Sequence, residues 1–284
     1  MESMYDCYEL NHGVRIPCMG FGTYKASDAS GTEVLKLALE AGYRYFDTAS
    51  FYGNEEAVGQ MLKDGKVKRE EVVLASKAWK DEMGYSEVKQ AFFASLKRLQ
   101  TDYLDIYLIH WPIPEPGYRE WKQLDIDTWK AMEELYKEGY VKTIGVSNFL
   151  PHHLENLICN AEVCPAVNQI EFHPGYTQEA VLSYCREKNI RVQAWSPLGR
   201  RALLNHPLLV EIAGHYEISV AQLCIRYAIQ RGVIPLPKAS APERLKENQN
   251  VFSFCISKED MYMISCMPQT AWSGQHPDYI GERE

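Results

Sequence analysis

The chain has 284 residues, a mass of 32.6 kDa, a formal net charge of −8 and a pI near 5.6. This acidic balance argues against a broad nucleic-acid-binding or anionic-membrane surface. No apolar run approaches the roughly 18 residues of a membrane-spanning helix. The start, MESMYDCYEL, carries Glu2 and Asp6 where a signal peptide is basic and then apolar. The eight cysteines form no C-x-x-C pair or zinc-ligand spacing, which is typical of reduced thiols. We therefore expect a cytoplasmic protein without a metal centre.

Strand-like and helix-like segments alternate along the chain. The strand-like segments are short and mostly apolar, as in a sheet covered on both faces, and they span residues 17–24, 44–49, 72–79, 104–110, 143–148, 166–172, 191–197 and 233–238. The helix-like segments, several of which end in Gly or Asn, span residues 34–42, 55–65, 87–99, 128–139, 150–158, 178–189 and 221–232. Before the first of these segments, Asn11-His12-Gly13 lies between two extended runs and predicts a β-hairpin.

The alternation favours a closed barrel. Eight β–α units in about 250 residues, without a linker, predict a single (β/α)8 TIM barrel, so we expect one domain over residues 1–284. The N-terminal hairpin would cap the bottom of this barrel. A doubly wound open sheet is the alternative, and it normally brings a G-x-G-x-x-G dinucleotide motif. In GFGTYK the third glycine position is Lys25, which disfavours that alternative.

Chemically active side chains follow three successive strands. In a barrel of this kind the C-terminal strand ends surround one shared mouth, and those ends carry Asp47, Tyr52, Lys77 and His110. Each has an ordinary explanation on its own. Asp47 could cap a helix, Lys77 could be neutralised by Asp47, Tyr52 could be loop packing, and His110 a satisfied buried histidine. Because all four side chains lie at matching strand ends, a purely structural role for every one of them is a weaker explanation than a shared site.

These four groups suit proton transfer to an oxyanion. A tyrosine near its reference pKa of about 10 is a poor acid at neutral pH, and a neighbouring ammonium stabilises its phenolate. Asp47 would keep Lys77 charged, and His110 would orient a substrate carbonyl toward Tyr52. The set fits protonation of an oxyanion formed by hydride transfer. A class I aldolase with Lys77 as a Schiff-base nucleophile is an alternative, although pairing with Asp47 disfavours a neutral lysine.

From GFGTY at residue 20 to HPD at residue 276, the sequence resembles the aldo-keto reductases. The motifs that carry this resemblance, in family order and spacing, are FDTASFYGNE, ASKAW, LDIYLIHWP, IGVSNF, NQIEFHP, AWSPLGR and PKASAPERLKEN. The resemblance implies NADPH-dependent reduction of an aldehyde or ketone to an alcohol, with Asp47, Tyr52, Lys77 and His110 as catalytic tetrad and Tyr52 as general acid. It also implies a small-molecule carbonyl as partner, and we expect a monomer. Because some relatives regulate channels, a non-catalytic nucleotide-sensing subunit is a second alternative.

The same resemblance implies a nicotinamide cofactor across the barrel mouth. The residues implied to contact it are Gly22, Thr23, Ser147, Asn148, Gln169, Trp195, Ser196, Leu198, Gly199, Lys238, Ser240, Arg244, Glu247 and Asn248. Of these, Lys238 at a strand end and Arg244 in an early helix turn would bind the 2′-phosphate of NADP. The family usually has Ser or Thr directly after that lysine, where this chain has Ala239. A lost neutral hydrogen bond costs on the order of 1 kcal/mol, less than an Arg–phosphate contact. NADPH is therefore expected over NADH, by a reduced margin.

The expected substrate wall is aromatic. It would consist of Tyr24, Trp79, Trp111 and Trp272, with His110 at its polar end, and it suits carbonyl compounds with flat or apolar bodies. Trp272 has rim packing as an equal alternative, because it lies in the C-terminal tail. The short loop after His110 and the short tail resemble those of microbial members named diketogluconate, glyoxal or prostaglandin reductases.

Overall fold

Ten strands form two sheets in the computed structural model, which describes residues 1–26 and 32–279. The first two, β1 (Cys7–Glu9) and β2 (Arg15–Pro17), pair antiparallel on either side of the predicted hairpin turn. The other eight pair in parallel, each with its neighbour in the chain. They are β3 (Phe21–Gly22), β4 (Tyr45–Asp47), β5 (Val73–Ala78), β6 (Ile106–Ile109), β7 (Ile144–Ser147), β8 (Val167–Glu171), β9 (Arg191–Trp195) and β10 (Ile234–Pro235).

Backbone hydrogen bonds between the first and last parallel strands close the sheet. The amide of Gly20 donates to the carbonyl of Pro235 at 3.1 Å, and that of Gly22 donates to Pro237 at 3.2 Å. A β-carbon added to Gly22 would lie 2.8 Å from the carbonyl oxygen of Leu236, so this close approach requires glycine. The predicted eight-stranded α/β barrel with an N-terminal hairpin is confirmed.

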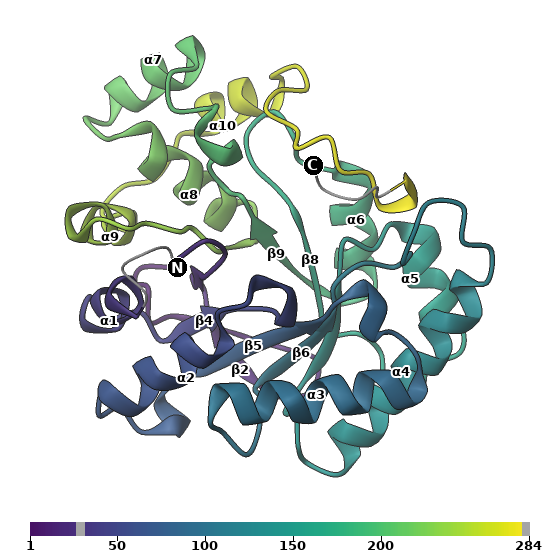
Figure 1. The fold of residues 1–284 in the computed structure, drawn as a ribbon. Coiled ribbons are helices and arrows are strands. Elements are labelled where there is room, and N and C mark those ends of the chain that lie inside the picture. The colour runs from purple at the N-terminus through teal and green to yellow at the C-terminus, as the bar shows by residue number, and fades with distance from the viewer. Residues whose placement is uncertain (27–31, 280–284) are drawn as a thin grey trace.

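Helices surround the curled sheet on its outer side (Figure 1). Seven of them match the predicted segments: α1 (Glu33–Glu40), α2 (Glu55–Asp64), α3 (Tyr85–Leu99), α4 (Trp121–Lys137), α5 (Pro151–Ile158), α6 (Glu179–Glu187) and α8 (Val220–Gln230). One boundary differs by more than two residues: α4 begins at Trp121 and not at Thr128. Asp125 interrupts the apolar pattern there, yet the structure buries it.

Three further short helices lie outside the predicted set. They are α7 (Pro207–His215), α9 (Pro242–Gln249) and α10 (Lys258–Ser265); only an early helical turn was expected where α9 lies. Helices of this length are stabilised mainly by packing and not by their own periodicity. Leu209, Leu245 and Ile264 are each fully buried, and they anchor α7, α9 and α10 in turn.

The N-terminal hairpin covers the bottom of the barrel, as predicted. Leu10 and Ile16 pack with residues that line the lower barrel interior, among them Ile106 and Ile234. A cavity of about 270 Å³ lies beside the hairpin, between its Glu9–Leu10 end and β9. It contains none of the candidate catalytic residues, because these lie at the opposite, C-terminal ends of the strands.

Across residues 1–26 and 32–279, none of the individual helices combines the length and apolar composition that a membrane span needs. The α7–α8 pair meets that length and composition test only when its two helices are taken together, and they are bent by 83° relative to each other.

Candidate active site

Lys77 lies at the centre of the strand-end cluster and is fully buried on β5. Its Nζ donates to Asp47 Oδ2 at 2.7 Å, to the carbonyl of Thr48 at 2.8 Å and to the Tyr52 hydroxyl at 3.4 Å. Burial by itself lowers the pKa of this ammonium, but the Asp47 carboxylate and the Tyr52 oxygen outweigh burial and raise the pKa above its ordinary value. Lys77 is therefore charged at neutral pH, which disfavours a Schiff-base nucleophile.

Asp47 is the last residue of β4, and each of its carboxylate oxygens accepts a hydrogen bond. While Oδ2 accepts from Lys77, Oδ1 accepts from Gln169 Nε2 at 2.7 Å. Gln169 Nε2 also lies 3.1 Å from Gln193 Oε1, which accepts from the Tyr45 hydroxyl at 3.0 Å. Gln193 and Tyr45 were not among the predicted site residues. The available signal was a polar side chain within an otherwise apolar strand, since Gln193 interrupts the apolar run of β9.

Tyr52 lies in a 3₁₀ turn, η1 (Ser50–Tyr52), which ends at Gly53 with a φ of 65°. A carboxylate beside the turn fixes its position. Glu82 Oε2 accepts from the Ser50 hydroxyl at 2.6 Å and from the backbone amide of Trp79 at 2.7 Å. Glu82 therefore connects the loop that carries Tyr52 to the loop that follows β5. No sequence pattern indicated this role.

Aromatic rings surround Tyr52 at the mouth. The ring centroids of Tyr24 and His110 lie 5.0 and 5.7 Å from that of Tyr52, and the Trp79 ring lies 4.9 Å from His110. Phe51, which the sequence did not suggest, stacks on Trp79 at 3.7 Å. Tyr24 and Phe51 are exposed and Trp79 is half-buried. These rings form an apolar wall beside the polar groups, as in small-molecule sites.

The other two predicted wall residues differ from each other in exposure. Trp111 is only 3% exposed, so it contributes mainly to the core. Trp272 is 39% exposed, and its ring stacks on Tyr176 with centroids 6.1 Å apart and an angle of 27°. Because Tyr176 follows β8, Trp272 lies at the same end of the barrel as the tetrad.

A second polar cluster joins the ends of β7, β8 and β9. Asn148 adopts a left-handed φ of 63°; its Nδ2 donates to the carbonyl of His110 at 2.9 Å and its Oδ1 accepts from Trp195 Nε1 at 2.8 Å. The Ser147 hydroxyl donates to the carbonyl of Gln169 at 2.8 Å. No described residue donates to Oε1 of Gln169, which leaves this acceptor available to the amide of a ligand.

The loop after β9 is tightly wound. Ser196 and Gly199 have left-handed φ angles of 50° and 53°, and the amide of Gly199 donates to the carbonyl of Ser196 at 2.8 Å. Leu198 lies half-buried between them. Left-handed conformations of non-glycine residues carry a cost and cluster at functional sites. Across the mouth, Thr23 is fully buried next to Gly22, and its backbone amide donates to the carbonyl of Asp47 at 2.9 Å.

Two cations lie near the end of β10. Lys238 is half-buried and Arg244, on α9, is exposed, and neither forms an ion pair with any carboxylate in the part of the chain that the structure describes. Ala239 is buried while Ser240 is exposed. Further along α9, Glu247 is half-buried and Asn248 is 3% exposed. A cation pair without protein carboxylates suits a phosphate ligand.

Comparisons with known proteins define the class of protein. Residues 18–266 match the model of the Aldo/keto reductase family, so the chain belongs to that family and is an oxidoreductase. It is 44% identical over 279 residues to glyoxal reductase of Bacillus subtilis, covering 98% of each chain. An aldo-keto reductase from a Medee basin deep-sea metagenome library matches with a TM-score of 0.90 at 37% identity, over 97% of this chain and 100% of that one. The Bombyx mori aldo-keto reductase solved in complex with NADP matches with a TM-score of 0.88 at 32% identity, over 99% and 100%.

Proposed function

We propose that this chain reduces an aldehyde or ketone to an alcohol, with NADPH as the reductant and Tyr52 as the proton donor. The observation that carries the proposal is the buried, charged amine of Lys77, which contacts both Asp47 and Tyr52. A phenol next to a fixed ammonium is suited to give up a proton. The similarity to a protein named glyoxal reductase supports a carbonyl substrate.

Each member of the tetrad has a distinct role in this proposal. Bound NADPH would supply a hydride to the carbonyl carbon. Tyr52 gives its hydroxyl proton to the carbonyl oxygen, and the Lys77 ammonium stabilises the phenolate that remains. Asp47, itself fixed by Gln169, keeps that ammonium charged. His110 lies beside Tyr52 and orients the carbonyl oxygen toward the phenol.

The described residues fit the cofactor at both of its ends. Lys238 and Arg244 form no ion pair within residues 1–26 and 32–279, which suits the 2′-phosphate of NADPH. At the opposite end, no described residue donates to Oε1 of Gln169, so this oxygen can accept from the carboxamide. The Bombyx mori relative was solved in complex with NADP, which supports the same cofactor class here.

Replacing Tyr52 by Phe tests the proposed role directly. Because proton transfer by a positioned side chain contributes roughly 10²- to 10⁴-fold, we expect Tyr52→Phe to lower kcat for carbonyl reduction by that factor. The Kd for NADPH, followed by quenching of tryptophan fluorescence, should stay unchanged. The matched control is Tyr262→Phe, which removes the hydroxyl of a tyrosine that is 70% exposed on α10. Substantial turnover by Tyr52→Phe would rule out Tyr52 as the acid.

A further inference from the structure

Glu171 is a buried carboxylate that the proposed reaction does not use. It ends β8, is 2% exposed, and lies in register with Trp195 of β9. Its two carboxylate oxygens accept hydrogen bonds from Ser273, which lies 102 residues further along the chain. The amide of Ser273 donates to Oε1 at 3.0 Å, and the Ser273 hydroxyl donates to Oε2 at 2.7 Å. His173 Nε2 lies 3.4 Å from Oε1. A buried carboxylate needs such donors, so Glu171 and Ser273 hold each other in place.

The tail residues next to Ser273 contact the candidate site. The amide of Thr270 donates to the carbonyl of Gly175 at 3.0 Å. Ala271, in a left-handed conformation with φ of 60°, lies against Gly199, since a β-carbon on Gly199 would come within 2.9 Å of the Ala271 side chain. Trp272 stacks on Tyr176. The bond between Glu171 and Ser273 thus fixes a segment, residues 270–273, that touches both the loop after β8 and the loop after β9.

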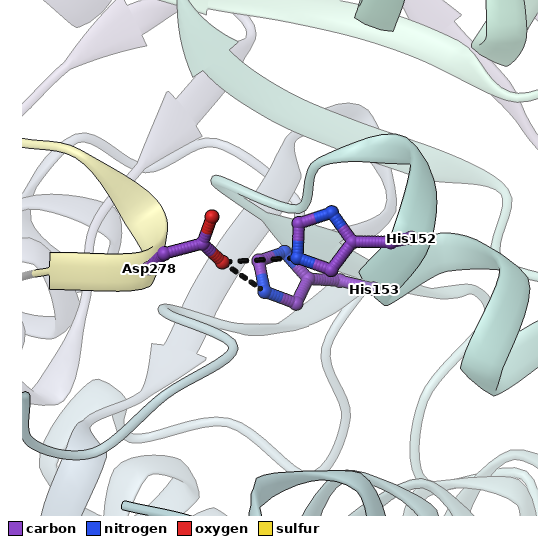
Figure 2. A group of neighbouring side chains, drawn as sticks. All are labelled: His152, His153 and Asp278. Atoms are coloured by element: carbon purple, nitrogen blue, oxygen red, sulfur yellow. Dashed lines mark hydrogen bonds and ion pairs between the residues drawn. The ribbon is translucent and has the colours of Figure 1, made fainter. Parts of the chain in front are cut away.

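A second anchor lies nearer the C-terminus. Figure 2 shows the rings of His152 and His153, at the start of α5, directed at Asp278. The Nε2 atoms of both rings lie 2.9 Å from Oδ1 of Asp278, which belongs to the 3₁₀ turn η5 (Pro277–Tyr279). The anchor therefore connects the tail to a helix that follows β7, the strand that carries Ser147.

These three side chains satisfy the distance criterion for metal ligands, since their ligand atoms all lie within 4.8 Å of one another. The tautomer of His153 argues against a metal ion. The backbone amide of Leu150 donates to Nδ1 of His153 at 3.1 Å, so Nδ1 carries no proton and the neutral ring carries it on Nε2. Burial, followed by the neighbouring His152, lowers the pKa of His153 to about 3, so the ring is neutral at physiological pH. Nε2 of the neutral ring thus carries the proton, lies 2.9 Å from Asp278 without the geometry of a hydrogen bond, and has no lone pair for a metal.

We propose that Glu171 is a positioning residue that, through Ser273, fixes Trp272 at the barrel mouth and thereby sets the affinity for carbonyl substrates with large apolar bodies. This inference rests on the proposed carbonyl reduction. Trp272 is the exposed aromatic ring of the fixed segment, and its loss of position removes contact area only from substrates that reach it. Small dicarbonyl substrates, which contact only the tetrad, are unaffected.

Steady-state kinetics with two carbonyls of different size test the inference. Ser273→Ala removes the hydroxyl donor, Ser273→Thr keeps it, and Glu171→Gln removes the charge while keeping an acceptor. With saturating NADPH, we expect Ser273→Ala and Glu171→Gln to raise KM for 4-nitrobenzaldehyde by roughly tenfold, as for the loss of a hydrogen bond to a charged group. Their kcat, and KM for methylglyoxal, should stay within about twofold of the wild-type values. Ser273→Thr should restore KM, and Ser265→Ala, at an exposed serine of α10, should change nothing.

Limited proteolysis gives a readout that does not depend on activity. If Glu171 holds the tail, chymotrypsin, which cleaves after aromatic residues, should cut after the exposed Trp272 faster in Ser273→Ala than in wild type and Ser273→Thr, as followed by intact mass. Equal cleavage rates together with an unchanged KM for the aromatic aldehyde would overturn the inference. If the wild-type protein reduces neither carbonyl, the proposed function fails, and the proteolysis rates alone decide whether Glu171 anchors the tail.

Discussion

Two opposing effects act on the charge of Lys77. Complete burial removes water from the ammonium, which favours the neutral amine, whereas Asp47 at 2.7 Å and the Tyr52 oxygen favour the charged form. The second effect is larger, so the pKa of Lys77 is raised. Asp47 accepts hydrogen bonds from Lys77 and Gln169, and the Lys77 amine also donates to the Tyr52 hydroxyl at 3.4 Å. In the proposed mechanism, Asp47 therefore acts on the phenol through the amine.

At the same scale, Arg244 should determine the preference for NADPH. If its guanidinium binds the 2′-phosphate, Arg244→Ala loses a charged hydrogen bond of about 1.5–3 kcal/mol, or roughly tenfold to a hundredfold in kcat/KM for NADPH. The value for NADH should not change, because NADH has no 2′-phosphate. Measuring kcat/KM for both cofactors checks this.

Lys246 provides the matched control for this prediction. It is an exposed cation on the same helix, α9, two positions from Arg244, and Lys246→Ala should leave both values unchanged. If Arg244→Ala lowered kcat/KM for NADPH and for NADH by the same factor, Arg244 would not bind the 2′-phosphate. A wild-type enzyme that uses NADH as well as NADPH would contradict the expected preference.

At the scale of elements, α4 contains a buried carboxyl group that lowers the stability of the folded protein at neutral pH. Asp125 is 0% exposed, and neither of its oxygens has a hydrogen-bond partner among the described residues. Burial raises the pKa of this carboxyl well above its ordinary value of 3.8. The folded state therefore binds this proton more tightly than the unfolded chain, and the free energy of unfolding decreases as pH rises above 3.8.

Replacing Asp125 by Asn should stabilise the protein at neutral pH. The amide does not ionise, so the loss of about 1.4 kcal/mol per pH unit between the unfolded and folded pKa values disappears. Urea unfolding of Asp125→Asn and wild type at pH 5 and pH 7.5 should show a larger stabilisation at pH 7.5. Asp127→Asn, at a half-buried residue of the same helix that bonds Gln123, is the control and should show little change. A pH-independent difference for Asp125→Asn would contradict the raised pKa.

At the scale of the molecule, we propose that residues 1–284 form a single domain. The strands that close the barrel, β3 and β10, come from opposite ends of the chain and are joined by the amides of Gly20 and Gly22. Any division of the chain would therefore break the sheet. Limited proteolysis with mass spectrometry should yield no protected fragment of about half the chain length. A fragment of that size that keeps its circular dichroism spectrum would indicate two domains.

The order of strands and helices could be predicted from the sequence because it depends on neighbours a few residues apart. Short apolar runs and the period-3.6 apolar pattern are local, and they located the eight barrel strands and seven helices. Two short helices, α7 and α10, were missed because packing and not periodicity stabilises them. The positions of Asp47, Lys77 and His110 at strand ends follow from the same local pattern, together with the rule that parallel strands share one C-terminal face.

By itself, then, the sequence determined the barrel and which side chains collect at its mouth. Only the tertiary structure decided how those side chains are held. Gln169 reaches Asp47 across 122 residues of chain, and Ser273 reaches Glu171 across 102. Exposure was likewise decided by packing, which buries Trp111 and leaves Trp272 at the surface. The physical reason is that hydrogen bonds and burial depend on which distant segments fold against each other, and no local period encodes that pairing.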